Sequence, residues 1–481
     1  MLITFLKGLS SFSTRTIYVI YSIFAITLII SYFTDLHKEN YVVILCGFLF
    51  LCSIGVVILR KGSSYLEKYN EKAVFLVLLL LCLGIKLSWV LVYRIQPLVD
   101  YATFYYTAEA LSKDFVINSR YVALFPHIFG YSSFLSIFLK IFGSSYMIPP
   151  FLNVVLTTIC MGLIYFICRR IAGVTGAIIA SVLWILLPSQ TIYNMFAMSE
   201  PLYCAELLLI WAIIIIVHDK FLNINMIKLL CYAVLLGMLL ALMNMARPIA
   251  AVPIIALGIW LFIIDTKHIR DRNILFKKGI YMGVIVAGYV LFSSLAQYYT
   301  TIRLGEEIAT TPGYNIHVGF NEIHLGSWNE EDSALLMGYN EKAGWTAKEV
   351  QQQMLEEAKN RIQNGNIKFP KLFFGKFLVF LNDDSAAVGY ANTVMDHKSR
   401  YITLCNMFYY FLIATSLFGA LIAFKRRDKS PAFFICLYFI GLTLAQMIVE
   451  VASRYHYSAT LTMVILATLG FCHTSKDRTV N

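Results

Sequence analysis

Long apolar runs alternate with short polar segments along most of this chain. A membrane-spanning helix needs about 20 apolar residues to cross roughly 30 Å of hydrocarbon. The runs predict spans near residues 17–33, 41–59, 73–93, 148–168, 172–189, 200–217, 228–246, 249–264, 279–297, 402–424, 431–449 and 458–472. The predicted fold class is an all-α polytopic membrane protein of about 12 transmembrane helices, with outer-face interfacial helices and one mixed outer loop region.

Two longer segments of mixed polarity interrupt this pattern. The first is an outer loop at 94–147, inside an N-terminal transmembrane region at 1–297. The second is a large extracytoplasmic loop at 298–401, and transmembrane helices follow it at 402–481.

The large loop contains one clear helix signal. Thr346 and Glu349 have the spacing of a capping box, and apolar residues then recur every four positions at Val350, Met354, Ala358 and Ile362. This predicts one amphipathic helix resting on the membrane part. The run at 372–381 is too short to span, and we expect it to dip into the interface.

Basic residues gather in alternate short loops, which predicts sidedness because such loops favour the cytoplasm. They are Arg60, Lys61, Lys68 and Lys72; Arg169 and Arg170; Lys267, Arg270, Arg272, Lys277 and Lys278; and Lys425, Arg426, Arg427 and Lys429. Both termini are therefore expected in the cytoplasm, with an even number of spans.

The apolar segment 122–142 complicates this count. It contains Pro126, His127 and Lys140, and a crossing here would move Arg169 and Arg170 to the outside. We therefore expect an interfacial helix on the outer surface.

Composition excludes two broad classes. The chain is 59% hydrophobic and 14% charged, whereas soluble domains have about 25% charged residues. The net charge of +11 lies in short loops rather than in a basic arm or stripe, which argues against nucleic-acid binding. The ten cysteines lie in or beside apolar runs, so no disulfide framework is implied.

Two acids lie at predicted outer ends of spans. Asp100 follows the third span among aromatic residues, where a carboxylate is placed to accept a proton. It is equally suited to cap a helix over 101–112. Glu200, between Ser199 and Pro201, is a second candidate, although acids and proline are also ordinary at helix starts.

Two arginines, Arg247 and Arg454, lie at the same predicted side. A guanidinium suits a phosphate because it gives paired, charge-assisted hydrogen bonds. The alternative is simple anchoring to lipid headgroups. The presence of two arginines and two acids on one side favours a binding site over headgroup anchoring.

Other charged residues give weaker signals. Lys86 and Glu206 lie inside apolar runs, where charge is costly, and we expect Lys86 to extend toward the outer end of its span. A group of His317, His324, Glu322 and Asp332 is too loosely spaced to favour a metal site.

The order of these features resembles the GT-C membrane glycosyltransferases that use polyprenyl-phosphate sugars, among them bacterial relatives of protein O-mannosyltransferases and the lipid A aminoarabinose transferase. The likeness covers residues 73–460. It rests on Asp100 with Tyr105, Ala108 and Leu111; Phe125-Pro126; 139–143; 165–170; Leu187-Pro188; 199–203; Arg247-Pro248; 450–455; and Asn315, Gly319, Phe320, Asn321, Gly326, Trp328, Asn329, Glu331 and Asp332.

The resemblance implies an enzyme that transfers a hexosyl or pentosyl group with inversion. Asp100 would be the general base, with Glu200 the next candidate. Arg454, Arg247 and Arg120 would bind the donor phosphate. Substrate contacts would come from Tyr105, His127, Asn321, Trp328 and Tyr455. No metal ligand and no required cofactor are expected, although a divalent metal stays an alternative.

This sequence departs from the family pattern in three places. Two spans precede the helix that leads to Asp100, where the family usually has one. Asp100 is a lone acid where a pair is common. A lysine expected before the proline-containing segment is absent, and Arg120 or His127 would replace it.

The expected partners are a polyprenyl-phosphate sugar, a lipid, wall-polymer or protein acceptor, and the bilayer of a bacterial cell membrane. Two alternatives stay open. A membrane polysaccharide polymerase would use lipid-diphosphate oligosaccharides. A lipid or sugar transporter would be expected to show related halves, and we find no such repeat.

Overall fold

The computed structural model describes residues 2–266 and 270–471, and that part of the chain folds into helices and connecting loops without a strand. Lys267 and the last residue of the run 458–472 lie outside it. Eight of the described helices are long and apolar enough to cross a membrane, by length and composition, and three further apolar helices are shorter. The chain is a multi-pass membrane protein.

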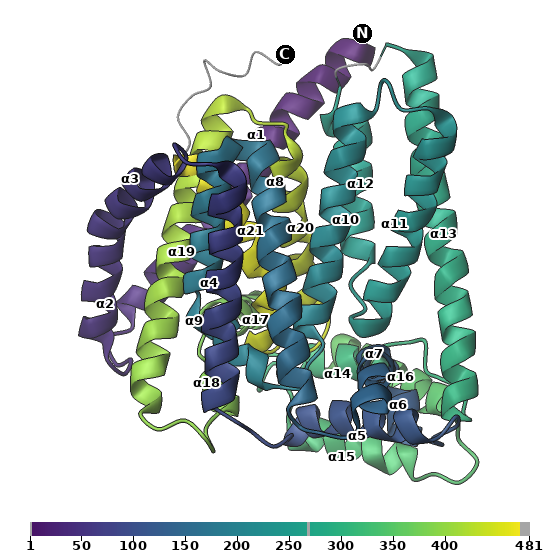
Figure 1. Cartoon of the computed structure of the whole chain (residues 1–481). Coiled ribbons are helices and arrows are strands. Elements are labelled where there is room, and N and C mark those ends of the chain that lie inside the picture. The colour runs from purple at the N-terminus through teal and green to yellow at the C-terminus, as the bar shows by residue number, and fades with distance from the viewer. Residues whose placement is uncertain (1, 267–269, 472–481) are drawn as a thin grey trace.

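The long helices form one bundle (Figure 1). Its members are α1 (Leu2–Thr34), α2 (Tyr41–Phe50) continued by η1 (Leu51–Gly55) and α3 (Val56–Leu66), α4 (Glu71–Val92), α8 (Ile148–Leu186), α10 (Glu200–Lys220), α11 (Met226–Ala246), α12 (Ala251–Ile259) continued by η3 (Trp260–Ile264), α13 (Arg272–Leu304), α19 (Lys398–Arg426), α20 (Pro431–Gln446) and α21 (Ala459–Phe471). Each predicted span coincides with one of these helices or with half of α8.

α8 is a hairpin rather than one long rod. Gly173 has φ 80° and ψ −173°, so the helix breaks there. The two halves run side by side, because the Trp184 indole donates to the Thr157 carbonyl, 27 residues earlier, at 3.0 Å. The adjoining runs predicted at 148–168 and 172–189 are thus two antiparallel helices.

The basic loops meet at one end of the bundle, which we call the basic end. Arg169 donates to Glu71 at 2.8 Å, and Arg170 pairs with Asp219. Lys277 donates to the Phe221 carbonyl at 2.7 Å. The described ends of α1 and α21 lie at this end too (Figure 1). The predicted alternation of basic loops is confirmed as a feature of the fold.

The opposite end carries a layer of shorter helices, and we call it the site end (Figure 1). The layer contains α5 (Val99–Lys113), α6 (Arg120–Leu124), α7 (His127–Phe142), α9 (Pro188–Ile192), η2 (Tyr193–Met195), α14 (Gly313–Gly319), α15 (Glu330–Asn340), α16 (Ala347–Asn364), α17 (Phe369–Leu381), α18 (Ala386–Tyr390) and η4 (Ser453–Ser458). It combines the two predicted outer loops with short connections between spans.

The segment 122–142 does not cross the bundle. α4 runs from Glu71 at the basic end to the layer, and α8 starts again from that layer. Near the start of α8, Asn153 donates to the Phe196 carbonyl at 2.6 Å, and the Phe196 ring stacks on Tyr101 of α5 at 4.6 Å. α6 and α7 therefore begin and end within the layer, as the interfacial interpretation requires.

The predicted amphipathic helix is α16. Its capping box is formed in both directions between Thr346 and Glu349. Val350, Met354 and Ala358 are buried, and the fourth residue of the stripe, Ile362, is half-buried. The short run at 372–381 also folds as a helix, α17, within the site-end layer.

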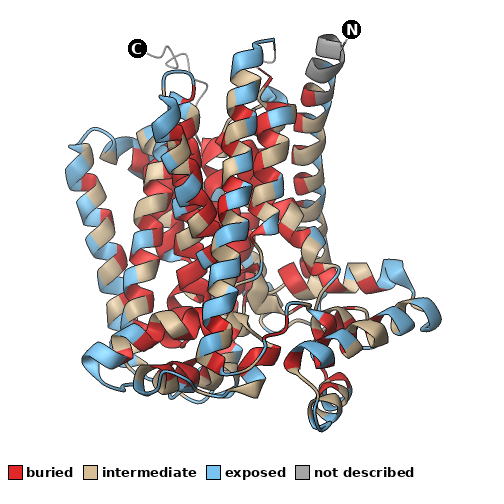
Figure 2. Cartoon of the chain, turned by 90° about the vertical axis from the view of Figure 1, so that its right-hand side faces the viewer, coloured by how far each residue is buried: buried red, intermediate tan, exposed pale blue. Residues whose placement is uncertain are grey.

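Burial separates central from peripheral helices (Figure 2). Of the most apolar window of α10, 78% is buried, against 6% for the segment Tyr41–Leu66. Lys86 on α4 is buried as well, with its Nζ 5.6 Å from the Trp184 ring and without a hydrogen-bond partner among the described residues. The expectation that Lys86 extends to the end of its span is wrong, because its side chain packs inward against α8.

Candidate active site

A cavity of about 820 Å³ opens where the layer meets the site end of the bundle. The cavity is lined by residues of α5–α7, α10, α11, α13, α14 and the segment between α20 and α21. Seven residues singled out from the sequence line it: Asp100, His127, Glu200, Arg247, Trp328, Arg454 and Tyr455. Residues up to 355 positions apart in the chain thus share one space.

Asp100 lies in the first turn of α5, directly after a strained residue. Val99 has φ 51°, a left-handed conformation that β-branched side chains rarely adopt. Such strain concentrates at functional sites. The N-cap of α5 is Leu98, so capping is not the role of Asp100. Its side chain is 48% exposed and lines the cavity.

Arg454 is the direct partner of Asp100. Its Nη2 donates to Asp100 Oδ2 at 2.5 Å, and its side chain is only 13% exposed. The guanidinium carbon also lies 5.5 Å from the Tyr455 ring centre and 5.6 Å from that of Tyr390. Its Nε has no acceptor among the described residues. One donor on Arg454 is therefore buried and unpaired.

Glu200 and Arg247 form a second pair. Arg247 Nη1 donates to Glu200 Oε1 at 3.4 Å, and the two side chains are 15% and 4% exposed respectively. Ser199 donates weakly to the other oxygen of Glu200, at 3.4 Å. Arg247 also lies 4.2 Å from the ring centre of Tyr455, so both arginines lie close to the same ring.

Glu450 also lines the cavity; it lies in the segment 450–455 that carries the family resemblance, but it is not among the site residues predicted from the sequence. Burial raises the pKa of its carboxyl to about 7; Arg454 opposes this rise, Asp100 adds to it, and Arg247 opposes it. The signal in the sequence is an acid at the end of a span, four positions before Arg454. That signal does not tell whether the side chain faces lipid, solvent or a cavity.

His127 enters the cavity from the start of α7. Burial lowers its pKa to about 4, and the positive charges of Arg247 and Arg454 lower it further. The imidazole is therefore neutral near pH 7. A neutral ring suits contact with a sugar hydroxyl better than pairing with a phosphate.

Two sets of buried contacts hold the segment that carries Glu450 and Arg454. At its start, Lys376 of α17 donates to the carbonyls of Met447 and Val449, at 2.9 and 2.7 Å. It also donates to the Gly319 carbonyl at 2.7 Å. The Glu450 amide donates to the Asn315 carbonyl at 2.7 Å. The large loop thus fixes this segment through its backbone.

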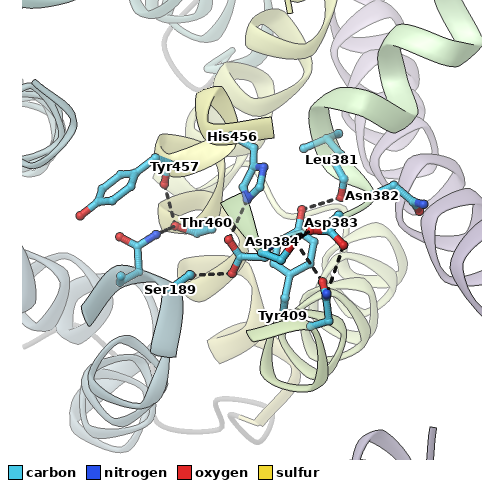
Figure 3. A network of polar contacts seen from close by, with 12 residues as sticks. Ser189, Leu381, Asn382, Asp383, Asp384, Tyr409, His456, Tyr457 and Thr460 are labelled. Carbon is cyan, nitrogen blue, oxygen red and sulfur yellow. Dashed lines mark hydrogen bonds and ion pairs between the residues drawn. The ribbon is translucent and has the colours of Figure 1, made fainter. Parts of the chain in front are cut away.

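At the end of the segment, a buried network fixes η4 (Figure 3). His456 lies with Nε2 3.0 Å from Asp384 Oδ1 and Nδ1 2.9 Å from the Phe380 carbonyl. Ser189 donates to the other oxygen of Asp384 at 2.5 Å. Burial raises the pKa of Asp384. The three side chains are almost fully buried, so they position Arg454 rather than meet a substrate.

Three residues selected from the sequence do not line the cavity. Tyr105 packs against Tyr146, with ring centres 4.8 Å apart, because five residues along a helix turn the side chain by about 140° from Asp100. Arg120 pairs with Glu306 and donates to the Trp345 carbonyl at 2.7 Å, which ties α6 to the large loop.

Asn321 is the third. It donates to Asp332 at 3.0 Å, and that carboxylate also accepts a hydrogen bond from Arg361 at 2.7 Å. His317 lies 3.2 Å from the same carboxylate. Among the described residues, no group of three or more metal-ligating side chains comes together. Asp332 organises the large loop.

Comparison with known proteins shows the fold. No protein-family model matches the chain, and no curated protein matches it by sequence. The solved oligosaccharyltransferase of Archaeoglobus fulgidus in the apo form aligns with a TM-score of 0.50 at 13% identity, over 85% of this chain and 51% of that one. The chain therefore shares the fold of this membrane protein.

Two further solved structures align less well. Archaeal oligosaccharyltransferase AglB from Archaeoglobus fulgidus, in complex with an inhibitory peptide and a dolichol-phosphate, gives a TM-score of 0.46 at 13% identity, over 84% of this chain and 50% of that one. ArnT from Cupriavidus metallidurans, bound to undecaprenyl phosphate, gives 0.31 at 11% identity, over 81% and 77%. This chain spans about half the length of the archaeal enzymes.

Proposed function

We propose that this protein transfers a sugar from a polyprenyl-phosphate donor to a hydroxyl acceptor on the outer face of the cell membrane, with inversion at the anomeric carbon. The observation that carries the proposal is the cavity in which Asp100 and Glu200 face Arg454 and Arg247. The shared fold with an oligosaccharyltransferase supports it.

The cavity fits the two ends of such a donor. Arg454 and Arg247 supply guanidinium groups suited to the phosphate. Beside them the cavity continues between α11 and α13, along Ala241, Ser293 and Ala296. These small side chains leave room for a prenyl chain that comes from the surrounding bilayer.

Asp100 accepts the proton of the acceptor hydroxyl in the proposed reaction. The hydroxyl oxygen attacks the anomeric carbon from the face opposite the phosphate, and the bond from carbon to phosphate oxygen breaks with its electron pair on the phosphate. A phosphate on Arg454 competes with Asp100 for the guanidinium, which frees the carboxylate as the donor binds. Positioning and charge stabilisation supply most of the rate.

Glu200 has a different role in this proposal. Its side chain is only 4% exposed and is held by Arg247 and Ser199. We therefore assign it to orienting Arg247 toward the phosphate. His127, Trp328 and Tyr455 are the proposed contacts to the sugar and acceptor, and the proposed chemistry assigns no step to a cofactor.

The test is transfer by Asp100→Asn in cells that lack the gene. Loss of the gene should remove one sugar from a lipid, wall polymer or protein, and glycan and lipid-intermediate analysis would identify both substrates. The wild-type chain should restore that sugar. Asp100→Asn should lower transfer by about 100- to 10,000-fold, as for loss of a general base.

Asp114→Asn is the matched control, because Asp114 lies exposed just beyond the other end of α5. It should restore transfer fully. Near-normal transfer by a folded Asp100→Asn protein would show that Asp100 is not the base. Unchanged glycans and lipid intermediates in the gene-deleted cells would refute glycosyl transfer itself.

A further inference from the structure

We infer that Glu450 carries a proton when the donor phosphate is bound, and passes that proton to the phosphate as the sugar leaves it. The inference rests on the proposed function and deepens it, because it names the group that protonates the leaving phosphate.

The charges around the cavity favour a protonated Glu450. Arg454 is paired with Asp100, and Arg247 with Glu200. Glu450 is a third carboxyl beside two guanidiniums that already have acidic partners. A bound phosphate adds another negative charge to the same space. With Glu450 ionised the cavity would hold an excess of two negative charges, and with Glu450 protonated only one.

The position of Glu450 in the chain brings it close to the proposed phosphate site. It lies four residues before Arg454, on the segment whose backbone is fixed by Lys376 and Asn315. Arg454 and Glu450 both line the cavity, so a phosphate held by the Arg454 guanidinium lies next to this segment. Glu450 is therefore placed to donate from its carboxyl to a phosphate oxygen.

Several elements set the charge environment of Glu450. The charged and titratable groups that interact with it are Arg454 and Tyr455 of η4, Asp100 of α5, Arg247 after α11, Tyr121 of α6, Tyr314 of α14, Tyr390 of α18 and Lys376 of α17. In the free protein its pKa is about 7, chiefly because of burial. Bound phosphate adds like charge, which raises the pKa further.

The proton balance of the reaction closes. The acceptor hydroxyl loses its proton to Asp100 as the new carbon–oxygen bond forms. The departing phosphate takes the Glu450 proton and leaves as a singly charged monoester. Asp100 is then protonated and Glu450 ionised, and exchange with water restores both before the next turnover.

The experiment measures binding of methyl farnesyl phosphate to the purified full-length chain in lipid nanodiscs, from about pH 5.5 to about pH 8.5. This phosphodiester keeps a single negative charge, whereas the second proton of a monoester titrates near pH 6 and would obscure the result. If Glu450 must be protonated, affinity should fall by about tenfold for each pH unit above its pKa.

Glu450→Gln should bind the probe at all pH values as the wild type does near pH 6, because the amide also donates a hydrogen bond but does not titrate. Glu450→Asp should keep the pH dependence and bind more weakly. Glu356→Gln, on the exposed face of α16, is the control and should behave as wild type. Thermal unfolding of each variant checks that it is folded.

Three outcomes would overturn the inference. A wild-type affinity that does not change with pH would refute protonated Glu450 while leaving the proposed function intact. Retention of the wild-type pH dependence by Glu450→Gln would assign the proton to another group. Failure of the wild type to bind the probe at any pH would refute the proposed donor class, and the inference with it.

Discussion

The buried network around Asp384 allows a prediction that depends on counting protons. A carbonyl only accepts, so Nδ1 of His456, 2.9 Å from the Phe380 carbonyl, must carry a hydrogen. At Nε2 two arrangements are equivalent: either the imidazole is charged and donates to an ionised Asp384, or a protonated Asp384 donates to a neutral ring. In both, one proton lies between Nε2 and Oδ1.

Asp384→Asn should therefore be tolerated. The amide nitrogen donates to a neutral His456, and the amide oxygen accepts from Ser189, so every partner is retained without any charge. We expect a loss of less than about 1 kcal/mol in the free energy of unfolding. Asp384→Ala leaves both partners buried and unpaired and should cost about 3–5 kcal/mol, as when one partner of a buried pair is removed.

Equilibrium unfolding of the purified variants in mixed micelles measures these costs, and binding of methyl farnesyl phosphate measures the effect on Arg454. Asp396→Asn, at an exposed position nearby, controls for removal of a charge and should leave both quantities unchanged. If Asp384→Asn were as unstable as Asp384→Ala, the network would need a negative charge and the proton count above would be wrong.

Three further predictions test the roles of other side chains. Arg454→Lys should weaken binding of methyl farnesyl phosphate by about tenfold or more, since one charge-assisted hydrogen bond contributes about 1.5–3 kcal/mol; equal affinity would contradict a phosphate site at Arg454. Arg120→Met should lower the thermal stability of the chain, by loss of its contacts with the large loop, and leave probe binding unchanged; weakened binding in a folded protein would return Arg120 to the site. His127→Asn should leave the shape of the pH profile of binding between pH 6 and 8 unchanged, because the pKa of His127 is about 4, and a shifted profile would show that His127 is protonated in that range.

The arrangement of the long helices follows directly from the sequence. Apolar runs of this length mark helices because only a helix satisfies all the backbone hydrogen bonds of a single segment inside a membrane, and the basic loops indicate the direction of each run. Even the hairpin within α8 is visible, since Arg169 and Arg170 separate two runs that would otherwise read as one.

The site is only partly visible in the sequence, because side chains in the layer face directions set by distant contacts. Asp100 and Arg454 stand out as charges at the ends of spans, but nothing local shows that they pair. Arg120 has the same local signal, yet Glu306 and the Trp345 carbonyl take its guanidinium. Glu450 becomes notable only once the fold shows that it lines the cavity with Asp100 and Arg454.

The contacts of Lys376 and Gly319 with the segment after α20 concern how this protein can change in evolution or by design. A Cβ on Gly319 would lie 2.6 Å from the Ile448 carbonyl oxygen, so the loop and the segment touch backbone to backbone. The large loop is therefore not an interchangeable module on a fixed bundle. A chimaera that takes this loop from another enzyme must take residues 447–458 with it. Otherwise Arg454 and Glu450 will no longer meet Asp100 in the cavity.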